Sequence, residues 1–472
     1  MATLTRFAWF LVPGLAQGVL SFVMLPIATL RLDAADYGAF GLMVALTALG
    51  TSVAMLGSGY RFAAVFGRDD RAEESSVVTA QLVASTAMLV AAGAALAALW
   101  WLAARRWDAV ADVTGVELAL SIGAMVGTSW WLTATEVLTL TRRARMFAAG
   151  MLLQSFTNAG ALAISLFGFD ADRSALYVAT FAASLAALVA AVIALRPYII
   201  VHLPRQRLRE VWSGIGMFSV SNTAESGYQV IERALLSGWT SLSHLGLYVH
   251  ALQYRALMSV AVKAGARSVW GDTLEEARQG SATFDRTRKI WALLYLFMTL
   301  FGLTLATIGR EFIGLLTHGK FTDAAPYAAG AVAILLAQNL GKPQTAILYA
   351  HGKGLALARM TVLSLVAAVI AAFFLVPLLG VWGAIVAGLL QSLTLRVQIF
   401  VLAKRLAPSP GQDRLAVLGL IALLIQIVYD GTHMTSAWTD RAVVCAVLTI
   451  VLIFMARREL RDIWGSRHLL RR

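Results

Sequence analysis

Cysteine, charge and hydrophilic stretches are all scarce in this sequence, and each scarcity excludes a class of protein. The single cysteine, Cys445, excludes an internal disulfide and a metal site built from cysteines. Charged residues make up 14% of the chain, whereas soluble proteins average about 25%. The seven histidines are scattered without the spacing of a metal site, so no metal or other cofactor is expected. Because every hydrophilic connection is short, we expect no separate soluble domain, and the function must lie among apolar segments.

Apolar runs dominate the chain: about fourteen of them can be marked, each roughly 20 residues long. A helix of that length crosses the ~30 Å hydrocarbon core of a bilayer. Irregular backbone exposed to lipid is not tolerated, so these runs are predicted to be helices. The sequence therefore predicts an all-α polytopic membrane protein with about fourteen transmembrane helices. The expected spans are 7–30, 37–60, 77–103, 114–139, 146–168, 174–195, 211–238, 244–267, 290–309, 325–350, 356–378, 381–403, 414–430 and 439–456. The hydrophilic insert from Asp272 to Lys289 is predicted to be an amphipathic helix on the membrane surface.

Lysine and arginine are unevenly divided between the two sides of these segments. With the N-terminus placed in the cytoplasm, about 27 of the 39 fall on the cytoplasmic side and about 7 on the opposite side. This excess follows the positive-inside rule, so we expect both termini in the cytoplasm. Basic residues beside a membrane also meet anionic headgroups, which accounts for the net charge of +13 without a nucleic-acid partner. The first apolar run is long and lacks a cleavage site, so no cleavable signal peptide is expected.

The two halves of the chain resemble one another. The first expected span ends before Asp36-Tyr37-Gly38, and the seventh ends before Leu245-Gly246-Leu247-Tyr248. Each half holds six spans, an even number, so the repeats are expected to be parallel and related by an axis along the membrane normal. The predicted organisation is a six-helix lobe over 1–196, a second six-helix lobe over 205–405, and two extra transmembrane helices with a basic cytoplasmic tail over 411–472.

Five basic residues fall inside apolar segments, namely Arg61, Arg233, Arg255, Lys342 and Arg396. A basic side chain at the bilayer centre costs about 2.5–3.5 kcal/mol on insertion scales, so these side chains are not expected to face lipid. Arg61 is interpreted as a boundary residue whose charge reaches the cytoplasmic interface. The other four are candidates for lining a cavity, and the planar guanidinium of the arginines suits a diphosphate.

A polar stripe runs along the seventh expected span. Asn222, Glu225, Gln229 and Glu232 are spaced three, four and three residues apart, which places them on one helical face. That face is expected to form either a hydrogen-bonding seam between packed helices or the wall of a cavity. Glu225 and Arg255 fall at similar depths on consecutive antiparallel helices, so an ion pair between them is expected, either structural or a switch.

Amide side chains supply a second kind of binding group within the spans. Glutamine and asparagine both donate and accept hydrogen bonds, which suits sugar hydroxyls. A cavity with amides and arginines matches a ligand that carries a diphosphate and a glycan. The candidate substrate-binding residues are Arg255, Arg396, Lys342, Arg233, Asn222, Gln229, Gln338 and Asn339, and the candidate coupling residues are Glu225 and Glu232.

An ordered set of short motifs resembles one transporter family over roughly residues 5–405. The motifs are Leu25-Pro26 with Asp36-Tyr37-Gly38, Ile231-Glu232-Arg233-Ala234-Leu235-Leu236, Leu245-Gly246-Leu247-Tyr248, the stretch 312–321, and the stretch 374–384. They resemble the Wzx-type oligosaccharide flippases of the MOP superfamily, which also holds the lipid II flippases and the MATE exporters. One departure is Glu232, where the family more usually has aspartate; the charge is unchanged.

This resemblance implies two six-helix lobes around a central cavity, in the inner membrane of a bacterium. It implies a non-enzymatic transporter that moves an undecaprenyl-diphosphate-linked oligosaccharide from the inner to the outer leaflet for surface polysaccharide synthesis. The movement would use alternating access driven by an ion gradient or the membrane potential. The implied partners are the lipid-linked oligosaccharide, membrane lipids, and a polysaccharide polymerase with other assembly proteins.

Three other functions remain open from the sequence. A MOP-type exporter could carry lipid II or a small cationic molecule, although a cation would favour an acidic cavity and the spans hold more basic than acidic residues. A membrane glycosyltransferase or polymerase would need a large outer loop and a cluster of catalytic acids, and neither is visible. The third open function is that of a non-transporting scaffold in a polysaccharide machine.

ATP use is not expected, because the phosphate-loop-like Gly314, Gly319 and Lys320 are followed by Phe321 instead of serine or threonine.

Overall fold

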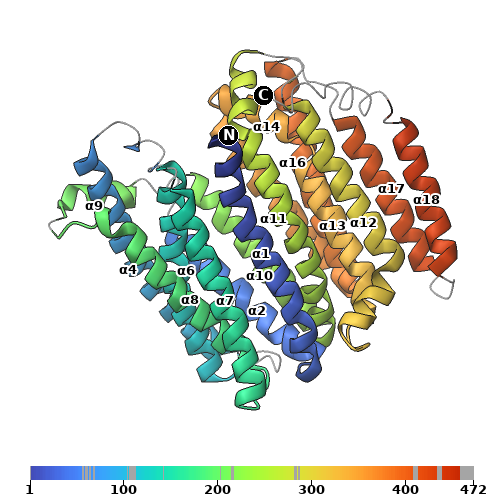
Figure 1. Cartoon of the computed structure of the whole chain (residues 1–472), viewed down its shortest axis with the longest axis horizontal. Coiled ribbons are helices and arrows are strands. Elements are labelled where there is room, and N and C mark those ends of the chain that lie inside the picture. The colour runs from blue at the N-terminus through green and yellow to red at the C-terminus, as the bar shows by residue number, and fades with distance from the viewer. Residues whose placement is uncertain are drawn as a thin grey trace. The chain divides into compact units, whose positions relative to one another are not determined.

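A computed structural model of the chain consists of α-helices and two short 3-10 turns, with no strand among the residues it describes (Figure 1). It describes residues 2–455 and 457 except 56–57, 59–61, 63–64, 67–69, 104, 106–112, 142, 202, 214–216, 281–283, 285–286, 408–412 and 433–437. Within its helices, the side chains of 2–11, 15, 21, 103, 213, 217–222, 264, 267–268, 271 and 413 also lie outside the description. By backbone contacts the chain divides into two units, Met1–Gly246 and Leu247–Arg472.

The helices follow one another with short connections. The first unit holds α1 (Ala2–Arg31), α2 (Ala34–Met55), α4 (Arg71–Ala103), α6 (Gly115–Leu140), α7 (Ala144–Gly168), α8 (Ser174–Leu195), the 3-10 turn η1 (Arg196–Tyr198), α9 (Arg205–Ser213), α10 (Met217–Trp239) and the start of α11 (Leu242–Arg278). The second unit holds the rest of α11, then α12 (Arg288–Leu316), η2 (Thr322–Ala324), α13 (Ala325–Asn339), α14 (Lys342–Ala350), α15 (Gly354–Leu379), α16 (Val381–Leu406), α17 (Asp413–Thr432) and α18 (Trp438–Met455).

Among the described residues, eleven helical segments are long and apolar enough to cross a membrane. The three other expected spans correspond to α6, α10 and α11, which are helices of 26, 23 and 37 residues. The predicted all-α polytopic membrane fold is therefore confirmed, and a total of fourteen spans is compatible with it. The orientation in the membrane and the division into two six-helix repeats stay predictions.

The hydrophilic insert after the eighth span is helical as far as Arg278, where it forms the end of α11, and not as one helix as far as Lys289, because Gln279 and Gly280 lie in a turn. Helix α11 continues unbroken to Arg278. Two polar residues of this stretch are buried: Thr273 accepts the indole N–H of Trp291 at 3.3 Å, and Glu276 accepts the hydroxyl of Thr287 at 2.8 Å. Because these bonds fasten it to the start of α12, the stretch prolongs the helix instead of lying apart from it.

Polar caps and small residues determine how the first unit packs. Helix α6 begins with a capping box, in which Thr114 and Glu117 satisfy each other's backbone N–H groups. Glu117 is buried and also accepts a hydrogen bond from Arg173 at 2.8 Å, which ties the start of α6 to that of α8. Further along, a Cβ on Gly127 would lie 2.0 Å from the carbonyl oxygen of Ser184. Glycine at this position lets α6 and α8 approach to backbone contact.

The two similar motifs noted in the sequence lie against each other in the first unit. A Cβ on Gly38 of α2 would lie 2.0 Å from the carbonyl oxygen of Leu242, in the first turn of α11. A Cβ on Gly246 would lie 1.6 Å from the carbonyl oxygen of Ala34, in the first turn of α2. Each glycine therefore touches the residue four positions before the other glycine. This reciprocal crossing joins α2 and α11 without any intervening side chain.

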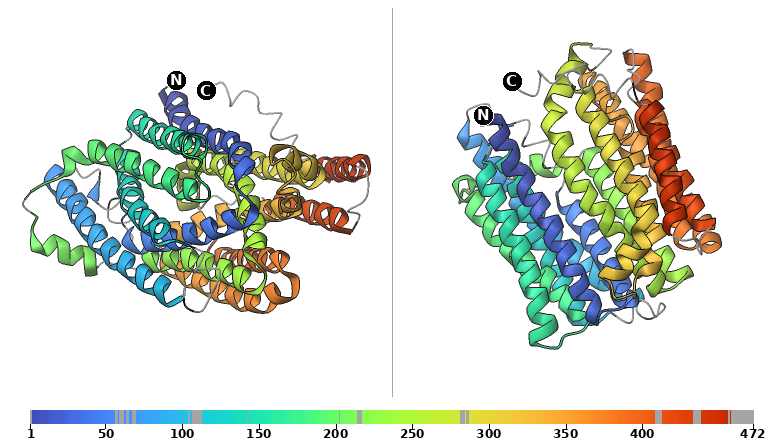
Figure 2. Two further views of the ribbon diagram at one scale, coloured as in Figure 1. Left: turned by 90° about the horizontal axis from the view of Figure 1, so that it is seen from below. Right: turned by 45° about the vertical axis from the view of Figure 1, so that its right-hand side comes forward.

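The second unit places α13 among other helices and α17 with α18 at its edge (Figures 1 and 2). In the span formed by α13 and α14, 83% of the most apolar window is buried, the largest share of the eleven spans. Helices α12, α16 and α17 pack against α13. At the edge, Arg441 of α18 forms ion pairs with Glu311 of α12 and Asp430 of α17, so charged contacts fasten the last two helices to α12.

Candidate functional site

A break in a buried helix organises the candidate site. One continuous span over 325–350 was expected, and the structure instead has two helices separated by Leu340 and Gly341. Leu340 is extended, with ψ 134°, and Gly341 is left-handed, with φ 67°, a conformation that glycine adopts at little cost. Pro343 then lies in the first turn of α14, where its missing N–H would have no helical partner anyway.

The break exposes carbonyl oxygens at the end of α13, and neighbouring helices satisfy them. Side chains from two helices donate to the last two carbonyls: Tyr295 of α12 donates its hydroxyl to Asn339 O at 2.9 Å, and the guanidinium of Arg396 on α16 donates to Gln338 O. Such groups cannot be left unpaired away from water without a large cost. The negative end of the α13 dipole also favours a cation at this place. Arg396 is therefore held at the break by the backbone itself.

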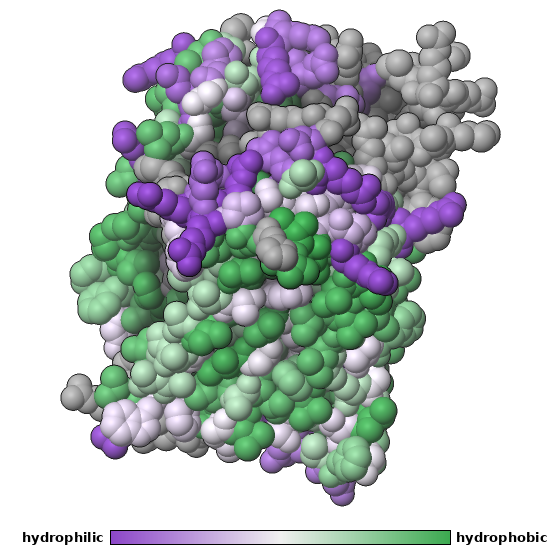
Figure 3. Space-filling view, turned by 90° about the vertical axis from the view of Figure 1, so that its left-hand side faces the viewer, coloured by the Kyte–Doolittle hydropathy of each residue, from purple (hydrophilic) through white to green (hydrophobic). Residues whose placement is uncertain are grey.

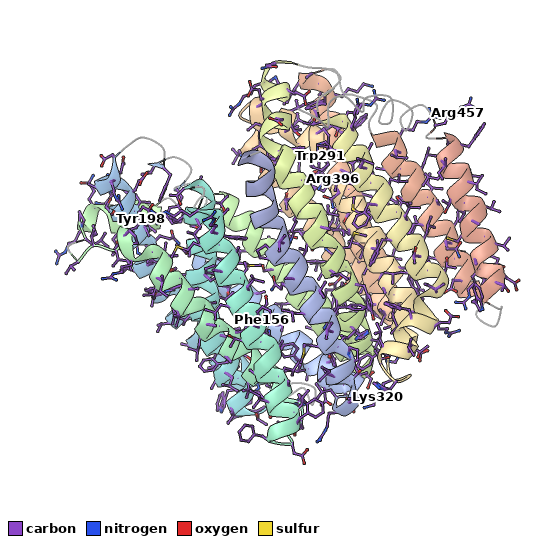
Figure 4. The ribbon with its side chains drawn as sticks, viewed as in Figure 1. Phe156, Tyr198, Trp291, Lys320, Arg396 and Arg457 are labelled. Atoms are coloured by element: carbon purple, nitrogen blue, oxygen red, sulfur yellow. The ribbon has the colours of Figure 1, made fainter. Side chains whose placement is uncertain are left out.

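Two arginines converge on Gln338. Arg255 of α11 donates to the side-chain oxygen of Gln338 at 2.9 Å, while Arg396 donates to the backbone oxygen of the same residue. Arg396 also donates to the hydroxyl of Thr345 in α14 at 3.3 Å. Both arginine residues are half-buried. Figure 4 shows Arg396 within the bundle of the second unit, close to the level of Trp291 and far from Lys320.

Arg255 is hydrogen-bonded to a neutral group. None of the ion pairs between described residues includes Arg255, and its hydrogen-bond partner is an amide. A neutral acceptor forms a weaker bond to a guanidinium than a carboxylate or phosphate does. The arrangement can therefore exchange the Gln338 side chain for an anion. Arg396, in contrast, is bound to backbone that cannot swing away.

The other expected site residues of the second unit lie at or beside the break. Lys342 is the first residue of α14 and is half-buried. Asn339 is buried, and its amide donates to Leu335 O at 2.8 Å, so it closes the last turn of its own helix. The structure thus gathers Arg255, Arg396 and Gln338 into one hydrogen-bonded cluster.

The expected site residues on α10 belong to the first unit. Arg233 is buried and donates to Gly41 O of α2, and Ser226 and Ser52 are 2.7 Å apart on the same two helices. This part of α10 is therefore a polar seam with α2. Glu232 is buried and accepts the hydroxyl of Tyr228 at 3.1 Å.

The residues of the polar stripe on α10 become more buried from Glu225 towards Glu232. Glu232 is buried, Gln229 is half-buried and Glu225 is exposed. The side chain of Asn222 lies outside the described residues, as does Arg61. The proposed pair of Glu225 with Arg255 stays a prediction, because these residues belong to different units.

Sequence reasoning missed Tyr295 and Thr345, both of which contact the break. A single buried tyrosine or threonine in an apolar helix gives no signal of its own. The break itself had a signal, because Gly341 followed by Pro343 is the combination that ends one helix and begins another. Locating it would have drawn attention to the polar residues that surround it.

Comparisons with known proteins identify the fold. No family model and no curated protein matches the sequence. Among solved structures, the chain is similar to the inward-facing conformation of a multidrug resistance MATE family transporter of the MOP superfamily, with a TM-score of 0.63, 15% identity, and coverage of 82% of this chain and 94% of that one. It is similar to the lipid II flippase MurJ in an inward closed conformation, with a TM-score of 0.64, 12% identity, and coverage of 98% of this chain and 100% of that one. A MATE structure in the straight conformation matches with a TM-score of 0.57 and 14% identity over 85% of this chain and 95% of that one. The chain is a multi-pass membrane protein with the fold of MOP-superfamily transporters and flippases.

Proposed function

We propose that this protein moves a polyprenyl-diphosphate-linked oligosaccharide from the inner to the outer leaflet of a bacterial inner membrane. The observation that carries the proposal is the cluster at the α13–α14 break, where Arg255 and Arg396 share one neutral residue, Gln338. Two half-buried arginines that meet at one neutral residue suit a diphosphate, which can accept several parallel charge-assisted hydrogen bonds.

The two arginines take different parts in the proposed binding step. Arg396 stays on the backbone of α13 and supplies a fixed positive charge. Arg255 releases the amide of Gln338 and binds the diphosphate, exchanging a neutral acceptor for an anionic one. The freed amide of Gln338 can then donate to and accept from a sugar hydroxyl.

Replacing Gln338 by the diphosphate as the acceptor of Arg255 would also make the substrate bind one conformational state better than the other, which alternating access requires. A ligand can shift a conformational equilibrium only if it binds one state better than the other. Glu225, exposed on α10, is the proposed partner of Arg255 in a state without substrate, and its protonation or its pairing would couple transport to an ion gradient or to the membrane potential. Lys342, Gln229 and Asn222 remain proposed contributors to the cavity wall; Asn339 would contribute only after its amide leaves Leu335 O.

The share of this chain that matches a flippase structure supports the proposed function. The match to the lipid II flippase covers 98% of the chain and leaves out only about 9 residues, so it extends into both α17 and α18, which are 20 and 18 residues long. The match to the MATE transporter covers 82%. A second candidate, export of lipid II or of a small molecule by the same fold, is supported by the comparable TM-scores of 0.63 and 0.64. The basic character of the cluster favours an anionic cargo over a cationic one.

The test uses a strain that lacks its own oligosaccharide flippase and carries variants of this protein. Arg255→Ala should abolish surface polysaccharide at normal membrane levels of the protein. Arg255→Lys should restore only part of it, because an ammonium cannot make two parallel bonds. Arg359→Ala is the matched control, since Arg359 is exposed on α15 and takes part in none of the hydrogen bonds of the cluster. Wild-type export by Arg255→Ala would contradict the assignment of the anion site.

A further inference from the structure

One side of the short helix α9 (Arg205–Ser213) is fastened to α4. Val211 is buried against Ala80 and Ala84 of α4, and Leu208 packs on the same cluster. Arg207 adds an ion pair to Glu73 at 3.2 Å. These contacts fix α9 as a rigid attachment to the first part of α4.

The connection that leads into α9 is fastened as well. The hydroxyl of Thr79 donates to Tyr198 O and accepts from the backbone N–H of Ile200, both at 3.1 Å. Although the backbone is held, two apolar side chains of this connection point outward: Val201 is 93% exposed and Ile199 is 43% exposed. Two exposed apolar side chains on a held segment can enter an apolar or interfacial surrounding without a rearrangement of the backbone.

The free side of α9 is basic. Arg205, Arg209 and Trp212 are spaced four and three residues apart, so they share one face, and all three are exposed. Arg205 and Arg209 line an open hollow together with Gln206 and Glu210. Neither arginine takes part in an ion pair among the described residues.

The one carboxylate at the hollow already has other partners. Glu210 accepts from Arg207 at 2.9 Å and from the amide of Gln206 at 3.3 Å. The hollow therefore offers two guanidinium groups to an external anion.

The length of α4 places this face at the height of lipid headgroups. The α4 span has 32 residues, about 48 Å at 1.5 Å per residue, which exceeds the ~30 Å hydrocarbon core by about 18 Å. The excess belongs to the charged start of α4, with Arg71, Glu73 and Glu74, because its other end carries the interfacial Trp100 and Trp101. Helix α9 contacts that charged start. Figure 3 shows hydrophilic residues gathered above an apolar face on this side of the molecule.

We infer that the basic face of α9 binds anionic phospholipids of the leaflet beside it, with Arg205 and Arg209 on the lipid phosphates and Trp212 and Val201 in the interface. Tryptophan favours the boundary between headgroups and acyl chains. Two arginines near an anionic surface give about a thirtyfold preference over a neutral surface. The inference concerns the surrounding lipid and does not depend on which molecule is transported.

The test measures which lipid contacts Val201. In a Cys445→Ser background, Val201→Cys carries an environment-sensitive fluorophore, and the purified full chain is placed in mixed phosphatidylcholine–phosphatidylglycerol bilayers. Brominated phosphatidylglycerol should quench the fluorophore more strongly than the same fraction of brominated phosphatidylcholine. Adding Arg205→Gln with Arg209→Gln should remove the difference.

The matched control removes two charges elsewhere. Lys353→Gln with Arg359→Gln affects exposed residues at the start of α15, and it should leave the preference for the brominated anionic lipid unchanged. Equal quenching by the two brominated lipids in the wild-type chain would overturn the inference. So would a preference that survives the loss of Arg205 and Arg209, or one that the control removes equally.

Discussion

Replacing Gly246 with alanine should force α2 and α11 apart at the point where they cross. The added Cβ would lie 1.6 Å from Ala34 O, whereas ordinary contact begins at 3.4 Å, so the helices must part by about 1.8 Å at this point. The obstructing atom belongs to the backbone, and no rotamer change can move it. Forced expansion of a packed contact costs about 1–3 kcal/mol. Alanine gains at most about 1 kcal/mol in helix propensity over glycine, so the net effect should be destabilising.

The assay is the temperature at which half of the detergent-purified protein loses its monodisperse elution after heating. Gly160→Ala is the control, because Gly160 lies in α7 with no neighbouring atom within 4 Å of its added Cβ. The control should be as stable as the wild type or slightly more stable, and Gly246→Ala should lose its elution peak at a lower temperature. Equal stability of the two variants would refute the backbone contact.

Three further outcomes follow from the hydrogen bonds. Tyr295→Phe removes the donor to Asn339 O and should cost about 1–3 kcal/mol, seen as a lower midpoint of thermal unfolding. Arg396→Gln should destabilise the protein more than Arg255→Gln does in the same measurement, because Arg396 binds the broken backbone whereas Arg255 binds a side chain; equal losses would argue against that distinction. Thr114→Ala should cost about 0.5–2 kcal/mol through loss of the capping box, and a Thr114→Ser variant should recover most of it.

The fold could be predicted because the features that determine it can be recognised within one helix at a time. Apolar runs of span length and the lack of hydrophilic stretches are sufficient to predict an all-helical membrane protein. A window that averages hydropathy over about 20 residues, however, cannot show that Leu340 and Gly341 interrupt one of these runs. Nor could it show that Thr273 is buried against α12, because burial of a polar group depends on its neighbours in space.

The candidate site was predictable in its residue types and less so in its grouping. Arg255, Arg396 and Gln338 were selected because charged and amide groups are costly in lipid, and the structure places them in contact. Arg233 was selected by the same reasoning, and it lies in a seam with Gly41. Sequence position alone cannot separate a seam from a cavity wall, because both satisfy a polar group away from lipid.

The enclosure of α13 bears on how the chain enters the membrane. The span formed by α13 and α14 has the lowest mean hydropathy of the eleven and carries Lys342, yet it has the largest buried share. A segment with such a weak preference for lipid is inserted poorly as an isolated helix. Its partition into the bilayer must therefore draw on helices that are already there, and α12 is the one that precedes it and packs against it. During synthesis, α12 would accordingly have to stay at the insertion site until α13 and α14 emerge, so that its surface can replace the lipid around them.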